Sequence, residues 1–115
     1  MFFIIISYKI ELMIELTSKQ RKFLEKNAQP LSPLVLIGGA GVTAEQIKQI
    51  DSLIAIHELI KIKFNEFKEE KRELSEEISQ KINATLVRII GNTAIFYRAA
   101  EDSEKRKFES GLLKA

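Results

Sequence analysis

The stretch Gly38-Gly39-Ala40-Gly41 contains the residues whose types and spacing best suit binding chemistry. It follows the short apolar run 34–37 and precedes Thr43, after which the pattern predicts a helix. A glycine loop that opens onto a helix N-terminus presents unpaired backbone N–H groups and the positive end of the helix dipole to one point. Such a point suits an anion, and most often a phosphate. The alternative is a tight turn in which glycine supplies a positive φ and nothing binds.

Two common phosphate-binding motifs do not fit this loop. No Lys followed by Ser or Thr comes after Gly41, so the loop is not a P-loop. The wider spacing of the dinucleotide fingerprint is missing as well. A G-x-x-G loop between a strand and a helix is, by contrast, typical of a loop that clamps a nucleic-acid backbone, as in KH domains. This hypothesis assigns RNA contacts to Gly38, Gly39, Ala40, Gly41 and Thr43.

Basic residues on two predicted elements also indicate a nucleic-acid ligand. Lys19, Arg21 and Lys22 lie in the first predicted helix, and Lys61 and Lys63 project from one face of a predicted strand. We add these residues to the predicted RNA contacts, where they would bind phosphate more than read bases. Both sets have an alternative interpretation, because helical lysines are mostly a solvated face and alternating lysines protect a strand from edge pairing.

The sequence lacks the residues that most enzymes and metal sites need. It has no cysteine, and His57 is its only histidine. A single histidine beside Glu58 is typical of a local hydrogen-bond partner, and no Ser–His–acid set or metal-ligand cluster is visible. We therefore expect no catalytic residue, metal, cofactor or small-molecule substrate. The formal net charge of +2 does not by itself indicate a nucleic-acid partner, and the lack of cysteine fits a reducing cytoplasm.

The hydrophobic pattern predicts an α/β domain with the element order α-β-α-β-α-β-β. Thr17 with Gln20 and Thr43 with Gln46 fit capping boxes at two helix starts. We expect a four-stranded mixed sheet packed with helices, in which the all-apolar run 34–37 is a strand covered on both faces. The predicted helices span 17–27, 43–57 and 68–83, and the predicted strands span 34–37, 59–64, 85–90 and 93–97, the last two joined at Gly91-Asn92.

Both ends of the chain lie outside this pattern. Residues 1–12 begin with an apolar run that is too short to span a membrane, and they lack the features of a signal peptide. They are either an extra strand or an upstream extension, and we favour an extension with Met13 as the natural start. Residues 99–115 are predicted to form a loose charged tail with one amphipathic turn around Phe108 and Leu112.

Four separate stretches occur in an order typical of one family. They are LTSKQR (16–21), AQPLSPLVLIGGAGVT (28–43), HELIKIK (57–63) and VRIIGNTAIFYR (87–98). Through them the chain resembles the bacterial YhbY family of small CRM-domain proteins (chloroplast RNA splicing and ribosome maturation). The resemblance covers about residues 14–98. It implies a CRM RNA-binding domain at 13–98, with a fold similar to the C-terminal domain of translation initiation factor three.

The resemblance also implies RNA binding without catalysis. In the family the GXXG loop and nearby basic residues are taken as the RNA contact, which corresponds here to the glycine loop and the basic residues named above. Ribosomal RNA and precursors of the large ribosomal subunit are the implied partners, with a role in ribosome assembly in the cytoplasm and no membrane contact. The alternative is a protein-interaction module in which the glycine loop is only a structural turn.

Overall fold

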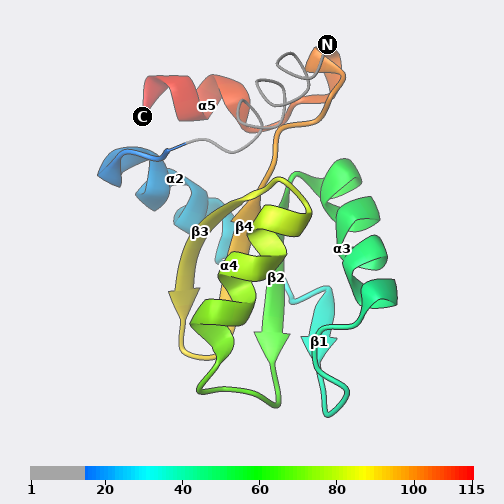
Figure 1. Ribbon diagram of the computed structural model, residues 1–115. Helices are drawn as coiled ribbons and strands as arrows, with labels where there is room; N and C mark the ends of the chain where they lie inside the picture. The colour runs from blue at the N-terminus through cyan, green and yellow to red at the C-terminus, as the bar shows by residue number, and fades with distance from the viewer. Residues whose placement is uncertain (1–14) are drawn as a thin grey trace.

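The predicted helices and strands follow one another in the predicted order along residues 15–115, the part of the chain that the computed structural model describes (Figure 1). The elements are α2 (Ser18–Ala28), β1 (Val35–Ile37), α3 (Ala44–His57), β2 (Leu59–Phe64), α4 (Lys71–Lys81), β3 (Thr85–Ile90), β4 (Thr93–Tyr97), a short 3₁₀ helix η1 (Ser103–Lys105) and α5 (Glu109–Lys114). The α/β class and the four-stranded mixed sheet are confirmed. The two hypotheses for residues 1–12 concern a segment outside the described residues.

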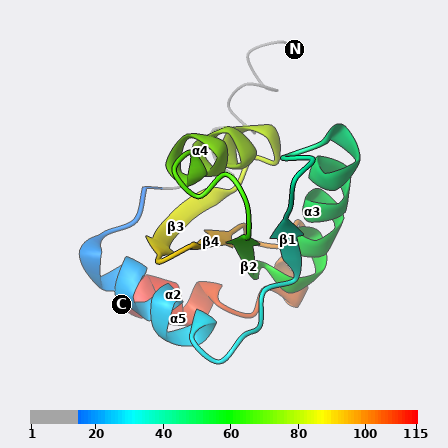
Figure 2. The same cartoon turned by 90° about the horizontal axis from the view of Figure 1, so that it is seen from below.

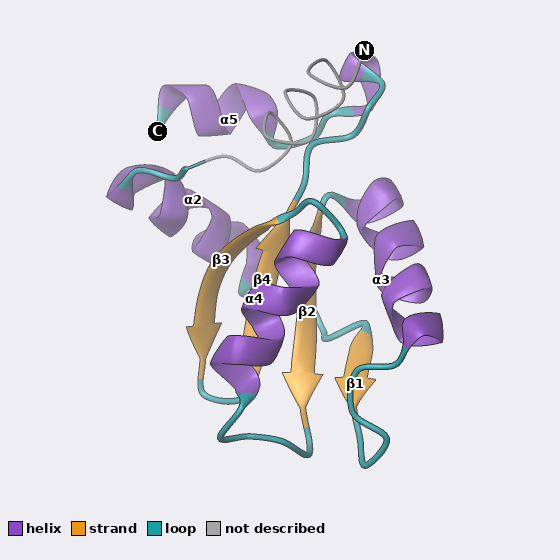
Figure 3. Ribbon diagram, in the orientation of Figure 1, coloured by secondary structure: helices purple, strands orange, loops and turns teal. Residues whose placement is uncertain are grey.

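The sheet has the strand order β1-β2-β4-β3 (Figure 3). Strand β1 pairs parallel with β2, since helix α3 returns the chain to the end of the sheet where β1 began. Strand β4 lies between β2 and β3 and pairs antiparallel with both. The predicted hairpin joins β3 to β4, and its Gly91 takes a φ of +59° in the turn. A register shift between Leu86 and Arg88 places a bulge at Val87.

Helices cover both faces of the sheet (Figure 2). On one face, Ile50 of α3 and Ile78 of α4 belong to the larger buried cluster. On the other face, Leu24 of α2 belongs to a second buried cluster that also contains residues of α5. Phe96 and Tyr97 point to opposite faces of β4, and both are buried because each face is covered at that strand.

Strand β1 differs from the expectation of a strand covered on both faces. Val35 and Ile37 are buried, whereas Leu36 between them is 53% exposed. β1 is an edge strand, and α2 packs against β2, β3 and β4 instead. The face of β1 that carries Leu36 therefore stays open.

Helix boundaries follow the capping signals where tertiary contacts allow. The first capping box is confirmed, since Thr17 Oγ1 accepts from the Gln20 N–H at 3.1 Å and Gln20 Oε1 accepts from the Thr17 N–H at 3.0 Å. The third helix is shorter than the predicted 68–83. It begins only at Lys71, after a turn in which the Glu70 N–H donates to the Phe67 carbonyl at 3.1 Å. It ends before Asn83, whose φ of +53° cannot continue a right-handed helix.

The C-terminal segment is folded, so the expectation of a loose tail is wrong. Leu112 of α5 is 4% exposed and packs in the second buried cluster, together with Leu24 of α2, which bears out the predicted amphipathic turn. The carboxylate of Glu58, which is fully buried, accepts hydrogen bonds from the N–H groups of Ala100 at 2.7 Å and Lys107 at 2.5 Å. The segment is held by a residue far away in the sequence, which a local pattern cannot indicate.

Candidate nucleic-acid interface

The glycine loop is fixed at both ends by backbone hydrogen bonds. The Gly41 N–H donates to the Gly38 carbonyl at 3.0 Å, which closes a turn across the loop. At the strand end, the Ile37 carbonyl accepts from the N–H groups of Asn65 and Glu66 at 3.0 and 3.1 Å. The loop is therefore a defined turn that connects β1 to α3 at one end of the sheet (Figure 1).

The glycines of this loop serve different purposes. Gly41 has a φ of +71°, and the Phe67 ring lies 3.5 Å from the position that a Cβ would take there. The turn itself therefore requires glycine at this position. Gly38 and Gly39 have no atom within 4 Å of their Cβ positions and no positive φ. A ligand backbone can approach these two residues without meeting a side chain.

Backbone N–H groups at the start of α3 are available to a ligand. Thr43 is the N-cap residue, and its Oγ1 accepts from the Gln46 N–H at 3.1 Å. Unpaired N–H groups at a helix start attract anions, helped by the helix dipole. Within residues 15–115, the N–H groups of Ala44 and Glu45 at the helix start donate to no other group, and neither do those of Gly39 and Ala40 in the loop.

Only half of the predicted capping box forms at Thr43. The Gln46 side chain does not accept from the Thr43 N–H; its Nε2 donates to the Leu36 carbonyl at 3.0 Å. Because β1 is an edge strand, its outer carbonyl groups need partners from outside the sheet, and Gln46 supplies one. This hydrogen bond holds the first turn of α3 against β1.

The charge around the loop differs between the two sides of the sheet. On the α4 side, a hollow of about 540 Å³ between Gly39 and the β2–α4 loop is lined by Glu66, Glu69 and Glu70 against Lys68. These carboxylates repel a phosphate chain. On the opposite face Lys63 of β2 lies in register with Leu36, two residues before Gly38. The electrostatic field therefore favours an anionic ligand on the Lys63 side of the loop.

The basic residues predicted on α2 fall into two groups. Lys19 and Lys22 are exposed, and with Lys26 they follow the i, i+3, i+7 spacing of one helix face. The first turns of α2 lie away from the glycine loop in both views (Figures 1 and 2). Arg21 is half-buried, and its Nη1 donates to the carbonyls of the β3 bulge, Leu86 (3.3 Å) and Val87. Arg21 therefore joins α2 to the sheet, a contact that no sequence pattern indicated.

The two lysines predicted on β2 also differ. Lys61 is half-buried, and its Nζ donates to the carbonyls of Gln29 at 3.2 Å and Leu31 at 3.0 Å. Lys61 thus fixes the segment that leads from α2 to β1. Lys63 is exposed, and its ammonium makes no hydrogen bond or ion pair with any residue in 15–115. Of the two, Lys63 has the ammonium free for a ligand.

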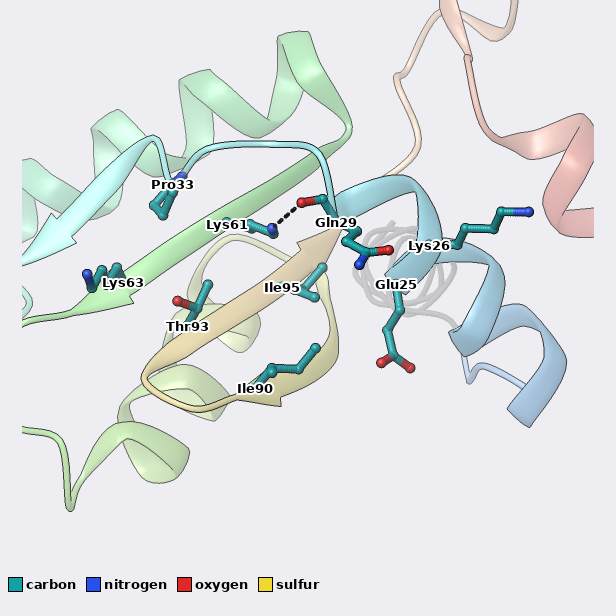
Figure 4. Close-up of a pocket in the computed structure, with 9 residues that line it drawn as sticks. All are labelled: Glu25, Lys26, Gln29, Pro33, Lys61, Lys63, Ile90, Thr93 and Ile95. Carbon is teal, nitrogen blue, oxygen red and sulfur yellow. Dashed lines mark hydrogen bonds between the residues drawn. The ribbon is translucent and has the colours of Figure 1, made fainter.

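Beside these lysines lies an open groove that the sequence predictions did not include (Figure 4). Its volume is about 570 Å³, and it runs between the C-terminal end of α2 and the uncovered part of the sheet. Lys61, Lys63, Thr93 and Ile95 line its sheet side, and Ile90 lines its far edge. The groove exists because α2 leaves this part of the sheet uncovered. The sequence of the strands does not indicate how much of the sheet a distant helix covers, so the groove could not be predicted from it.

The described residues hold neither a metal-binding cluster nor a membrane-spanning helix. Among residues 15–115, no group of three or more His, Cys, Asp or Glu side chains is arranged to bind a metal ion. No helix in that range has the length and apolar character needed to cross a bilayer. His57 is exposed at the end of α3.

Comparison with known proteins places these features in a wider group. The profile of the CRS1 / YhbY (CRM) domain matches residues 16–98. The probable RNA-binding protein YqeI of Bacillus subtilis is 33% identical over 91 residues, which cover 78% of this chain and 95% of YqeI. An RNA-binding protein of Haemophilus influenzae is 33% identical over 93 residues, with 80% and 94% coverage. The solution structure of SAV1595 from Staphylococcus aureus superposes with a TM-score of 0.67 at 34% identity, covering 81% of this chain and 98% of that one.

Proposed function

Since the chain belongs to the CRS1 / YhbY (CRM) domain family, we propose that it is an RNA-binding protein that acts on precursors of the large ribosomal subunit. Two relatives that are matched over nearly their whole length carry names describing RNA binding. The fold supports the proposal because it supplies a fixed loop with unpaired N–H groups and an unpaired lysine nearby. Catalysis is not part of the proposed role.

The observation that carries the proposal is the open backbone at Gly38 and Gly39. No atom lies within 4 Å of either Cβ position, and the N–H groups of Gly39 and Ala40 have no partner in residues 15–115. An RNA phosphate can therefore accept hydrogen bonds from the loop and from the start of α3, next to Thr43. Lys63 supplies a free positive charge on the favoured side, in register with Leu36 of β1.

The other basic residues enter the proposal with smaller roles. Lys19 and Lys22 provide long-range attraction for the phosphate chain, since they are exposed but lie on a distant part of α2. Arg21 and Lys61 contribute positive charge while their main contacts are within the protein. We propose the cytoplasm, where ribosomal particles assemble, as the place of action.

A pair of double variants tests the glycine loop. Gly38→Asp with Gly39→Asp puts two carboxylates where the phosphate would lie, and both sites have room for a side chain. Each carboxylate at 4 Å from a phosphate costs about 1 kcal/mol in water, so the RNA Kd rises about 30-fold. The matched control, Gly38→Ala with Gly39→Ala, adds side chains without charge. Gly41 is left unchanged because a side chain at its positive φ would strain the fold, and a loss of binding could then result from misfolding.

The assay is fluorescence polarisation with labelled ribosomal RNA fragments at low salt. Thermal melts of both variants check that the fold is intact. If the Asp variant binds as tightly as the Ala variant and both are folded, the loop is a structural turn and the proposed contact fails. If the wild-type protein binds no RNA at all, the proposed function fails.

A further inference from the structure

A row of four side chains crosses the whole sheet next to the glycine loop. The strand pairings place Leu36 opposite Lys63, Lys63 opposite Thr93, and Thr93 opposite Ile90. Because paired residues project from the same face, the four side chains form one line from the edge of β1 to the edge of β3. The line begins two residues before Gly38, and three of its members, Lys63, Thr93 and Ile90, line the groove in Figure 4.

Two of the four side chains in the row are apolar and exposed to solvent. Leu36 is 53% exposed and Ile90 is 54% exposed, although both lie on the sheet. Beside Ile90 the groove has a floor that includes Ile95, which is 2% exposed, and a wall that includes Pro33. Exposed apolar groups that surround a hollow are typical of a binding site.

The charged groups of the groove sum to a positive value. Lys63 has a free ammonium, and Lys61 uses two of its N–H donors on the Gln29 and Leu31 carbonyls, which leaves one. The carboxylate of Glu25 is paired with Arg88 at 3.3 Å, so this pair adds no net charge. Lys26 also lines the groove, but its ammonium extends away from it in Figure 4. The groove thus combines two ammonium groups with apolar surface.

We propose that this groove holds one unstacked nucleotide of a single-stranded RNA whose neighbouring phosphate lies on the glycine loop; the idea rests on the proposed function. The base packs on Ile90, above the floor of the groove, Lys63 binds the phosphate, and the Thr93 hydroxyl hydrogen-bonds a base edge. Charge complementarity favours RNA as the occupant, because every nucleotide brings a phosphate to the two lysines. Proteins that read RNA sequence mostly bind such unpaired bases.

The test compares single-stranded and double-stranded RNA. The variant is Ile90→Ala, which removes apolar area from the groove at a site that is already half exposed. The matched control is Ile56→Ala, since Ile56 is 67% exposed on α3 and lies outside the groove. The probes are a labelled 12-nucleotide oligoadenylate and a labelled 12-base-pair RNA duplex, and melting temperatures verify folding.

We expect Ile90→Ala to weaken binding of the oligoadenylate about fivefold, with little change in its salt dependence. Duplex binding stays at the wild-type level, because paired bases cannot enter the groove. Thr93→Val, which keeps the volume and removes the hydroxyl, also weakens single-strand binding alone. If wild type and Ile90→Ala bind the single strand equally, the proposal is overturned, and a protein becomes the better candidate for the occupant of the groove. Equal weakening for both RNAs also overturns it. A wild-type protein that binds neither RNA refutes the proposed function itself.

Discussion

Replacing Glu58 by glutamine tests how the C-terminal segment is held on the fold. The Glu58 carboxylate is fully buried and accepts hydrogen bonds from the N–H groups of Ala100 and Lys107, at 2.7 and 2.5 Å. Its backbone carbonyl accepts from the Arg98 N–H at 2.8 Å, so Glu58 holds the chain at three positions that follow the last strand, β4. Glutamine has nearly the same shape but only one acceptor oxygen.

The expected loss of stability follows from these two contacts. In Glu58→Gln one of the two N–H groups loses its carboxylate acceptor and faces an NH₂ group instead. A hydrogen bond to a charged group contributes about 1.5–3 kcal/mol, and an unsatisfied buried donor adds to that cost. The total loss in the free energy of unfolding is about 2–4 kcal/mol. For a chain of this size it lowers the melting temperature by about 8–16 °C.

The assay is thermal unfolding followed by circular dichroism, with limited proteolysis to detect release of the C-terminal segment. Glu69→Gln is the matched control, because Glu69 is an exposed carboxylate in the β2–α4 loop. The control should melt within about 2 °C of the wild type. If Glu58→Gln also melts within that range and resists protease like the wild type, the buried carboxylate does not hold the segment and the reasoning is refuted.

Three further predictions concern charge, pH and packing. Lys63→Gln removes one phosphate contact and lowers the slope of log K against log salt for single-stranded RNA by about 0.7, and an unchanged slope would exclude this contact. Burial, with Glu58 and Glu109 adding to it, raises the pKa of Tyr97 from 10.0 to about 12 while Arg106 opposes the shift. The stability from neutral Tyr97 is therefore present below pH 10 and is lost as the pH rises toward about 12. In urea unfolding, the free energy of unfolding of Tyr97→Phe should fall less than that of the wild type between pH 10 and about 12. Equal falls in both proteins would contradict the raised pKa of Tyr97. Leu112→Ala should cost about 2–4 kcal/mol in urea unfolding, and a cost near zero would show that α5 does not pack as described.

Local signals in the sequence were sufficient for most of the fold. The Thr17 capping box, the hairpin at Gly91 and the period-two pattern of β2 each depend on neighbours in the sequence, and each appears in the structure. The position of the glycine loop between β1 and α3 follows from the same signals. These features are predictable because a few adjacent residues decide them.

The features that the sequence did not indicate depend on contacts between distant elements. The sequence does not distinguish Arg21 and Lys61 from basic residues that are free to bind a ligand. In the structure both side chains donate hydrogen bonds to backbone carbonyls of other segments. Leu36 belongs to an apolar run, and its exposure is determined by where α2 packs. Glu58 has a charge that predicts exposure, yet it is buried because two N–H groups from the C-terminal segment surround it.

Crosslinking in living cells tests the central claim most directly. Cells that produce the tagged protein are irradiated, the protein is purified under denaturing conditions, and the attached RNA is sequenced. The account predicts crosslinks concentrated in ribosomal RNA of the large subunit, and strongly reduced in the variant with Gly38→Asp and Gly39→Asp. Recovery of no RNA above the untagged background, or equal recovery with the folded Asp variant, would contradict it.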